Sequence, residues 1–522
     1  MTFTEWFLFF LLVQVIHFLG TWKLYQKAGR KAWEAAIPVY NAVILMKIIN
    51  RPWWWTILLF IPIVNLIMFP VVWVETIRSF GRNSTTDTVL VILTLGLYIY
   101  YVNYALDVQH IKDRSLQPRS AAGEWISSIL FAIVAATIVH AYIMQPFTIP
   151  TSSLEKTLLV GDYLFVSKFH YGARTPMTPI AFPMVHDTIP GVKVKSYLKE
   201  PQIPYFRLPG FEKIEHNDIV VFNWPIDTVR QFFDRSGAHY EKPVDKKSNY
   251  VKRAVGLPGD SLEIREGDIY IDGTILELPE RARPQFSYIG STNGQGFNRF
   301  NLYERYDITD YFGYDPASNR FVATAMTQEA FERFQNHPNV TSIERYLAEP
   351  GSQERSIFPN NGKVPWNRDN MGPIYIPKQG ESVEMDLESF SLYRRIIEVY
   401  EGTEMGVTQD LSVNDDQILM NGQPLESYTF KQNYYWMMGD NRHNSEDSRY
   451  WGYVPENHVV GKPVFIWLSL DPNGSGLSKV RWERMFTTVG GPGQPISYLP
   501  YFLILLIAGF AYNYFRKSKK KQ

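Results

Sequence analysis

The stretch I-P-T-S-S-L-E-K-T-L-L-V-G-D-Y-L-F-V-S-K, from Ile149 to Lys168, determines how this chain is organised. It follows a long apolar run at 125–144 and opens with a cluster of hydroxyl side chains at 151–153. It then becomes an apolar, β-favouring run near 163–166. The stretch therefore predicts a membrane span that leads directly into a β-rich domain, with serines a few residues beyond the membrane.

Length and composition narrow the class of protein. A chain of 522 residues allows roughly three domains. Lys plus Arg, 52, equals Asp plus Glu, 52, so the net charge gives no indication of a nucleic-acid partner. The chain has no cysteine, which excludes disulfides, thiolate metal sites and a cysteine nucleophile.

Five apolar segments are long enough to cross a bilayer, which takes about 20 residues. They lie near residues 4–21, 53–74, 88–106, 125–145 and 497–515. Pro62 and Pro70 predict a kink or a break in the second segment. A weaker stretch at 35–49 is expected to be an interfacial or re-entrant helix. The alternative is that one weak span is only a buried helix.

Basic residues are concentrated in the loop between the first two spans, in the loop before the fourth span and in the C-terminal tail. Such loops stay in the cytoplasm. We therefore expect a multi-pass protein of the cytoplasmic (inner) membrane, with its N-terminus outside and its C-terminus inside. The predicted parts are a multi-span region (1–123), a span (124–146), a periplasmic β-rich domain (147–496) and a C-terminal span with a basic cytoplasmic tail (497–522).

The extracytoplasmic part has the pattern of β-structure. Strands or hairpins are predicted at 218–222, 261–271, 418–420 and 461–470, and a short helix capped by Thr327 is predicted at 327–334. Two stretches rich in Pro, Gly, Asn, Arg and aromatic residues, 172–215 and 281–410, are interpreted as insertions or a second subdomain.

A serine acts as a nucleophile only when a base accepts its proton. The chain has ten His, but it contains no G-x-S-x-G elbow and no H-E-x-x-H helix, so α/β-hydrolase and zinc-protease functions are not indicated. Lysine is the other known base for serine. Lys252 lies in Y-V-K-R-A-V-G-L-P-G-D (250–260); the alternative is a solvated strand lysine.

A third stretch is M-G-D-N-R-H-N-S-E-D-S-R-Y-W-G-Y-V-P (438–455), which is dense in Asp, Asn, Ser and Arg and is flanked by Trp436 and Trp451. The alternative is a polar surface loop stabilised by Asx turns. Its length and its aromatic flanks favour a more ordered structure.

Together the three stretches resemble the boxes of the bacterial type I signal peptidases, or leader peptidases, which are membrane-bound Ser/Lys endopeptidases. The extended N-terminal membrane region is similar to the long forms of Bacteroidetes-type bacteria. The resemblance implies a mainly β catalytic domain, a signal-peptidase-like β fold with insertions, attached to an α-helical multi-span membrane region. It does not extend to the first three spans or to the two insertions.

The resemblance implies a role for each matching residue. Ser153 would be the nucleophile, Lys252 the general base, and Ser445 the residue that orients the lysine amine. The Thr151 hydroxyl and the Ser153 backbone N–H would form the oxyanion hole. The supporting charged residues would be Arg253, Asp440, Asp447 and Arg449, and the substrate pocket would be lined by Ile149, Pro150, Leu154, Leu158 and Val251.

The assignment has one departure from the family pattern and one requirement on the acidity of Lys252. The family often has Met-x-Pro after the nucleophile, whereas this chain has 154–156 as Leu-Glu-Lys, a change that keeps apolar bulk and loosens the loop modestly. A free lysine has a pKa of about 10.4, so Lys252 becomes a base near neutrality only if burial lowers its pKa by roughly three units.

The implied activity is that of a serine endopeptidase that removes N-terminal signal peptides after small residues, at Ala-x-Ala sites. No metal or cofactor is expected. The expected partners are preproteins, the lipid bilayer and, by proximity, the secretion translocon, with no nucleic acid. Residues 281–410 carry no recognised catalytic motif, and deletion of about Pro284 to Pro365, rejoined by a short Gly/Ser linker, is expected to keep peptide cleavage.

Two alternatives remain. One is another Ser/Lys hydrolase of the same clan, such as a repressor autoprotease, although those proteins are soluble. The other is a membrane-anchored binding or assembly protein with a degenerate peptidase domain.

Overall fold

The computed structural model describes residues 1–118, 120–229, 237, 239–414 and 417–519. The chain divides into two compact units, Met1–Ile143 with Arg174–Arg207, and Met144–Ala173 with Leu208–Gln522. Arg119, Lys520 and Lys521, which contribute to the predicted basic loop and tail, lie outside the described residues.

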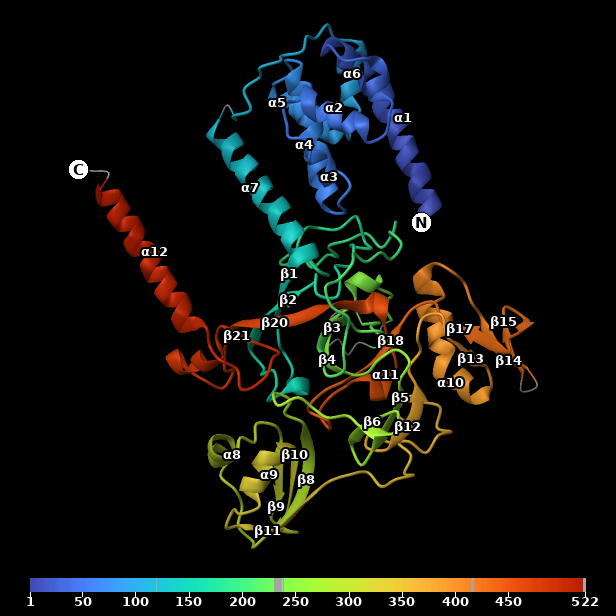
Figure 1. Ribbon diagram of the computed structural model, residues 1–522, viewed down its shortest axis with the longest axis vertical. Helices are drawn as coiled ribbons and strands as arrows, with labels where there is room; N and C mark the ends of the chain where they lie inside the picture. The colour runs from blue at the N-terminus through green and yellow to red at the C-terminus, as the bar shows by residue number, and fades with distance from the viewer. Residues whose placement is uncertain (119, 230–236, 238, 415–416, 520–522) are drawn as a thin grey trace. The chain divides into compact units, whose positions relative to one another are not determined.

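The Met1–Ile143 part of the first unit is mostly helical (Figure 1). Its helices are α1 (Phe3–Lys27), α2 (Tyr40–Ile48), α3 (Trp55–Leu58), α4 (Val64–Ser79), α5 (Thr85–Leu93), α6 (Tyr98–Tyr104) and α7 (Ala121–Ile138). Thr2 and Glu5 form a capping box that begins α1, and the Ser120 hydroxyl caps α7. Helices α4 and α7 pack through apolar side chains, with Val134 and Ile138 against the cluster that contains Met68.

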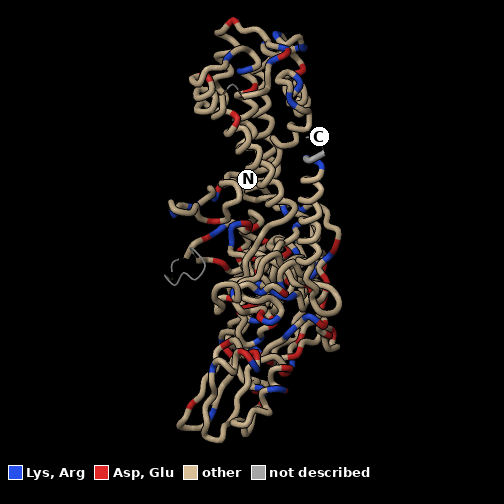
Figure 2. The backbone as a smooth tube through the Cα atoms, turned by 90° about the vertical axis from the view of Figure 1, so that its left-hand side faces the viewer, with Lys and Arg blue, Asp and Glu red and all other residues tan. Residues whose placement is uncertain are grey.

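Three helices of the described residues are long and apolar enough to cross a membrane: Phe3–Lys27, Ala121–Ile143 and Leu499–Lys517. They correspond to the first, fourth and last predicted spans. The last lies in α12 (Leu499–Lys519), whose Lys and Arg residues stand near its C-terminal end (Figure 2).

The two remaining predicted spans are interrupted. Helices α5 and α6 are bent by 119° at a short break, as in a broken span or a re-entrant loop. The segment 53–74 is divided between α3 and α4 and contains no continuous helix of spanning length. Pro62 falls in that gap, where its missing N–H and fixed φ disfavour a helix. The count of five spans therefore stays a prediction.

The second unit is mostly β, and its main sheet carries the strands that precede and follow each sequence box. Seven strands follow one another across it in the order β1-β2-β20-β3-β4-β18-β19, and β21 pairs with β20. Their bounds are β1 (Met144–Thr148), β2 (Asp162–Ser167), β3 (Ile219–Asn223), β4 (Asn249–Gly256), β18 (Tyr434–Met438), β19 (Val454–Pro455), β20 (Val459–Ser469) and β21 (Thr487–Thr488). Every residue of β3 and β18 is buried, so both faces of the sheet are covered there.

The predicted strands and hairpins are confirmed. The segment 218–222 corresponds to β3, and 461–470 to β20. The segment 261–271 forms the hairpin of β5 (Ser261–Arg265) and β6 (Asp268–Ile271), which β7 (Thr274–Ile275) and β12 (Met371–Tyr375) extend into a four-stranded sheet. Glu266 and Gly267 make the turn with φ of 51° and 82°, a conformation that glycine adopts at little cost.

A second group of short elements packs against this hairpin sheet. Its elements are α10 (Leu387–Arg395), β13 (Ser382–Glu384), β14 (Leu411–Asn414), β15 (Gln417–Met420), β16 (Gln423–Pro424) and β17 (Ser427–Thr429). The predicted strand 418–420 lies in β15. Leu262, Tyr393 and Ile397 share one buried core with Trp436 of the main sheet.

Residues 285–345 form a lobe of their own, the insertion lobe (Figure 1). Its sheet has the order β11-β8-β10-β9, from β8 (Gln285–Thr292), β9 (Phe312–Asp315), β10 (Arg320–Thr327) and β11 (Val340–Arg345), with α8 (Arg299–Tyr306) and α9 (Gln328–Phe334). The predicted helix and its Thr327 cap are confirmed, since the Thr327 hydroxyl accepts from Ala330 N. The second half of the stretch 281–410, with β12 and α10, packs in the buried core that also contains Trp436 of the main sheet.

Candidate active site

Ser153 stands where the chain leaves the edge of the main sheet. Strand β1 ends at Thr148, and a single 3₁₀ turn, Ser152–Leu154, follows. The backbone bond from Ile149 N to Asp162 O, 2.9 Å, holds the base of this loop against β2. The Leu154 side chain is buried in the core beneath it. These contacts present the serine from a short loop on a rigid support.

Lys252 approaches from the middle of the same sheet. It lies on β4 opposite Val220 of β3, and only 3% of it is exposed. Its Nζ is 2.6 Å from Ser153 Oγ and 5.3 Å from the centroid of the Tyr250 ring. Two residues 99 positions apart in the chain are therefore in direct hydrogen-bonding contact.

Burial changes the acidity of this lysine. It lowers the pKa of Lys252 from 10.5 to about 8, although the carboxylates of Asp447 and Glu446 act in the opposite direction. Loss of hydration disfavours the ammonium form, which explains the direction. A substantial fraction of neutral amine is therefore present near pH 8, beside the hydroxyl it would deprotonate.

Two buried ion pairs fix the loop that follows β18. Arg253 Nε and Nη2 donate to Asp440 at 2.8 and 2.6 Å, and the Thr157 hydroxyl donates to the same carboxylate at 2.6 Å. Arg449 Nε and Nη2 donate to Asp447 at 2.9 and 2.8 Å. Burial alone would raise the pKa of Asp440, but Arg253, the Thr157 hydroxyl and Arg442 together lower it below its ordinary value. The four supporting residues predicted from sequence thus form two pairs, one of which links β4 to the loop.

Ser445 lies against Gly439 at the start of this loop. A Cβ on Gly439 would be 2.2 Å from Ser445 Oγ and 2.6 Å from Ser153 O. The Ser445 hydroxyl is buried and has no hydrogen-bond partner among the described residues. The structure brings Ser445 close to the loop that carries Ser153, but its predicted role in orienting Lys252 stays a prediction.

A cleft of about 510 Å³ lies over the serine and the lysine. Four of the residues named from sequence line it: Pro150, Thr151, Ser153 and Lys252. Acidic and amide side chains contribute much of the remaining wall: Glu155, Asp310, Asn444 and Glu446. The other residues predicted for a substrate pocket lie deeper. Ile149, Leu154 and Leu158 are buried in the core, and Val251 packs against them.

The insertion lobe contributes directly to this cleft. Tyr303, Thr309 and Asp310 line it beside Ser153. These three residues belong to the segment 284–365, whose predicted dispensability for cleavage stays a prediction. The lobe also makes backbone contact with the loop after β18, since Gln285 N donates to Asp440 O at 2.8 Å.

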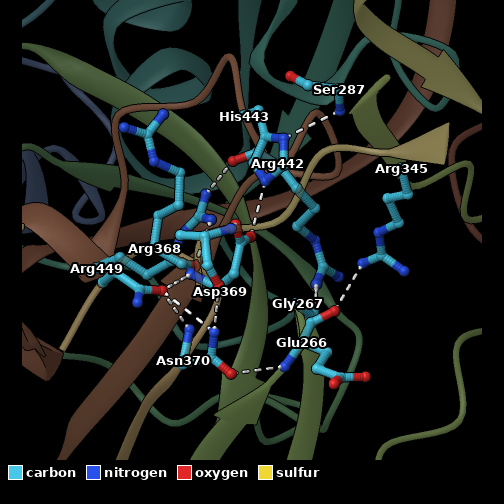
Figure 3. Close-up of polar contacts among 12 residues, drawn as sticks. Glu266, Gly267, Ser287, Arg345, Arg368, Asp369, Asn370, Arg442, His443 and Arg449 are labelled. Carbon is cyan, nitrogen blue, oxygen red and sulfur yellow. Dashed lines mark hydrogen bonds and ion pairs between the residues drawn. The ribbon is translucent and has the colours of Figure 1, made fainter. Parts of the chain in front are cut away.

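Figure 3 shows a second connection, which sequence reasoning missed. His443 Nδ1 accepts from Ser287 N at 3.0 Å, and His443 Nε2 contacts Asp369 Oδ1 at 2.7 Å. The same loop is held by Arg442 Nη1, which donates to Gly267 O at 3.2 Å. Their separation in the sequence does not predict that Ser287, Asp369 and His443 lie together. The one available signal was a histidine among the acidic and amide residues of 439–449.

The site brings a buried serine and a buried lysine into contact, which is the pair that a serine-type peptidase with a lysine base requires. The model of the family "Signal peptidase, peptidase S26" matches residues 122–341 and 398–468, more than half of the sequence, and the chain belongs to that family. A model for a family of unknown function matches residues 33–113, in the helical unit.

Individual relatives agree with the family. The chain is 24% identical over 355 residues to signal peptidase I of Buchnera aphidicola subsp. Acyrthosiphon pisum, covering 67% of this chain and 76% of the relative. It is 26% identical over 376 residues to signal peptidase I of Helicobacter pylori (strain 26695), covering 70% and 92%. It is 24% identical over 383 residues to that of Haemophilus influenzae, covering 72% and 78%.

Proposed function

We propose that this chain is a signal peptidase I that removes N-terminal signal peptides from secreted preproteins by a Ser/Lys mechanism. The observation that carries the proposal is the 2.6 Å contact between Ser153 Oγ and Lys252 Nζ, both buried beneath a cleft. The relatives named above are signal peptidases I, which supports this choice of substrate class.

In the proposed mechanism, neutral Lys252 accepts the proton of Ser153 as the serine oxygen attacks the scissile carbonyl. The lysine then returns that proton to the leaving amine, and a water molecule hydrolyses the acyl-enzyme by the same route. The Thr151 hydroxyl and the Ser153 N–H would stabilise the oxyanion. Ser445, beside the pair, would orient the lysine, and the two ion pairs would hold the surrounding loop.

The substrate would carry small residues, Ala-x-Ala, before the cleaved bond. Pro150 would form part of the wall that limits their size, and Ile149, Leu154, Leu158 and Val251 would form an apolar floor behind it. The apolar signal segment of the preprotein would reach the cleft from the membrane, since only the helical turn Val139–Ile143 separates α7 from β1 in the chain.

We further propose the multi-pass topology predicted from sequence, with the parts 1–123, 124–146, 147–496 and 497–522. The catalytic unit would lie on the periplasmic side and the C-terminus in the cytoplasm, because basic loops stay inside. In this topology the cleft would lie where preproteins emerge, near the translocon. A binding or assembly protein with a degenerate site is the less favoured function, because the serine and lysine are both present and in contact.

The direct test is incubation of the purified full-length protein with a preprotein that contains an Ala-x-Ala site, followed by mass spectrometry of the products. We expect a single cut after the second alanine, and no cut with Ser153→Ala. Cleavage that persists in Ser153→Ala would refute the proposed nucleophile. A folded wild-type protein that binds the preprotein without cutting it would favour the assembly function.

Gly439→Ala provides a test of how tightly the loop after β18 packs on the nucleophile loop. The added methyl group would collide with Ser445 Oγ at 2.2 Å and Ser153 O at 2.6 Å, so one of them must move. A displacement of about 1 Å at a reacting group can cost on the order of 100-fold in rate. We expect a loss of that size in kcat.

Gly422→Ala is the matched control, since no atom of the described residues lies within 4 Å of its Cβ position, although its φ of +81° makes it mildly strained. Normal kcat in Gly439→Ala would argue against this packing.

A further inference from the structure

Asp310, in the segment after α8 of the insertion lobe, contacts the loop after β18 through a single carboxylate oxygen. Its Oδ2 accepts a hydrogen bond from Asn441 Nδ2 at 2.6 Å and another from Asn444 Nδ2 at 3.1 Å. One acidic side chain of the insertion lobe therefore holds two amides that lie on either side of His443 in the chain.

The same two amide nitrogens also hold the residue before the nucleophile. Asn441 Nδ2 donates to Ser152 O at 3.1 Å, and Asn444 Nδ2 donates to Ser152 Oγ at 3.1 Å. A side-chain amide nitrogen has two hydrogens. Each nitrogen is therefore shared between Asp310 and Ser152, and all four N–H groups of the two amides are used.

The carboxylate determines which end of each amide faces the serine loop. Asn441 Oδ1 is buried and has no hydrogen-bond partner among the described residues, so this orientation is not set by the amide oxygen. Turning the Asn441 amide over would place that oxygen against two acceptors, Asp310 Oδ2 and Ser152 O. The acceptor oxygen of Asp310 therefore favours the orientation in which Asn441 Nδ2 faces Ser152 O. Ser152 O also accepts from Glu155 N at 2.9 Å, so the amide adds a second donor to the same carbonyl.

Holding Ser152 O fixes the backbone N–H of Ser153. The peptide group is planar and trans, so the C=O of residue 152 and the N–H of residue 153 point in opposite directions from one rigid plane. Asn441 N also donates to Ser153 O at 3.1 Å, which fixes the following peptide group. Together these bonds set the direction of the Ser153 N–H, the donor proposed for the oxyanion.

We propose that Asp310 is a positioning residue for the reaction: through Asn441 and Asn444 it fixes the peptide group before Ser153 and so aims the Ser153 N–H at the developing oxyanion. This inference rests on the proposed function. A second link supports it, because Lys156 Nζ and Asp307 Oδ1 lie 2.6 Å apart and join the same insertion segment to the other side of the nucleophile loop.

Kinetics of Asp310→Ala provide the first test. The oxyanion exists in the transition state and not in the bound substrate, so a misdirected donor lowers kcat and leaves KM nearly unchanged. Removing an oxyanion donor outright costs about 100- to 1,000-fold, and we expect a smaller loss, about 10- to 100-fold, when the donor is only misdirected. Asp310→Asn keeps an acceptor oxygen in place and should restore most of kcat.

The matched control is Asp315→Ala in the same lobe. The Asp315 carboxylate accepts from Ala317 N at 3.0 Å and from Ser318 Oγ at 2.6 Å within its own turn. This variant should cleave like the wild type. Asn444→Ala removes the exposed one of the two amides that join Asp310 to Ser152, and it should lower kcat several-fold. This variant replaces Asp310→Ala in the test if Asp310→Ala does not fold.

Hydrogen–deuterium exchange of the segment 149–158 gives a readout that needs no activity. We expect faster exchange in Asp310→Ala and wild-type exchange in Asp310→Asn and Asp315→Ala. Wild-type kcat in Asp310→Ala, an equal loss in Asp310→Asn, or unchanged exchange would overturn the inference. If the wild-type protein cleaves no preprotein, the proposed function fails, and the exchange comparison still decides whether Asp310 holds the loop.

Discussion

Replacing Lys252 with alanine is expected to lower the rate of preprotein cleavage by about a thousandfold or more, because it removes the base that contacts Ser153 Oγ. Lys252→Arg should be equally inactive, since a guanidinium stays protonated at any pH the protein survives. Initial rates from quantified cleavage products, with folding checked by circular dichroism, measure both effects.

The control for these variants is Lys378→Ala, which removes a lysine whose side chain is 53% exposed and which pairs only loosely with Glu381 at 3.8 Å. It should keep wild-type activity. Near-normal cleavage by Lys252→Arg would contradict the mechanism. So would a histidine substitution that abolishes cleavage without unfolding the protein. His443→Ala is expected to act through stability, because that ring joins Ser287 to Asp369.

Asp440→Ala is expected to have the largest effect on stability. It leaves the Arg253 guanidinium buried without its carboxylate and removes the acceptor of the Thr157 hydroxyl. Breaking a buried pair by removing one partner costs about 3–5 kcal/mol. The midpoint of thermal unfolding in detergent should fall clearly, whereas Glu381→Ala, which breaks an exposed pair, should change stability by less than about 1 kcal/mol.

The pH dependence of stability follows from the same pair. The fold lowers the pKa of Asp440, so the unfolded chain binds its proton more readily than the folded protein does. The stabilisation is therefore fully present above the ordinary pKa of an aspartate, about 4, and is lost as the pH falls through the lower folded value. This acid-sensitive component should be missing in Asp440→Ala. An unchanged acid profile and an unchanged unfolding midpoint would show that the pair contributes little.

The part of the site that depends on local motifs could be predicted from sequence. Ser153 and Lys252 lie in short stretches whose neighbours are themselves distinctive, and the two ion pairs involve residues of the same stretches. The strands could be predicted too, because β3, β5, β6 and β20 are apolar or alternating runs bounded by turn residues. Each of these signals is local in the chain.

The contribution of the insertion lobe could not be predicted, because it depends on contacts between distant segments. Asp310 reaches Asn441 across 131 positions, and Asp369 reaches His443 across 74. An aspartate in a polar loop has the same local pattern whether it faces solvent or a cleft. The pocket residues show the converse: Ile149 and Leu158 are apolar, which predicts burial but not whether they face the substrate or the core.

Prediction of the membrane spans was limited because hydropathy does not distinguish a span from a buried helix. Apolar composition predicted segments of spanning length at 53–74 and 88–106, but the structure interrupts both. Short apolar helices packed on each other have the same composition as a span, so hydropathy alone does not separate them. Pro62 and Pro70 were the local signals of a break in 53–74, and the helix is interrupted at Pro62, whereas Pro70 lies inside α4.

The most direct test of the Ser/Lys mechanism is the pH dependence of kcat/KM for the wild-type protein, which reports the ionisation of essential groups in the free enzyme. The base is active when neutral, and burial lowers the pKa of Lys252 to about 8. We therefore expect kcat/KM for the preprotein to rise with pH through a single group with a midpoint near 8 and to level off above it. A midpoint near 6.5, the ordinary pKa of histidine, or a rate that is independent of pH between 6 and 10 would contradict the account.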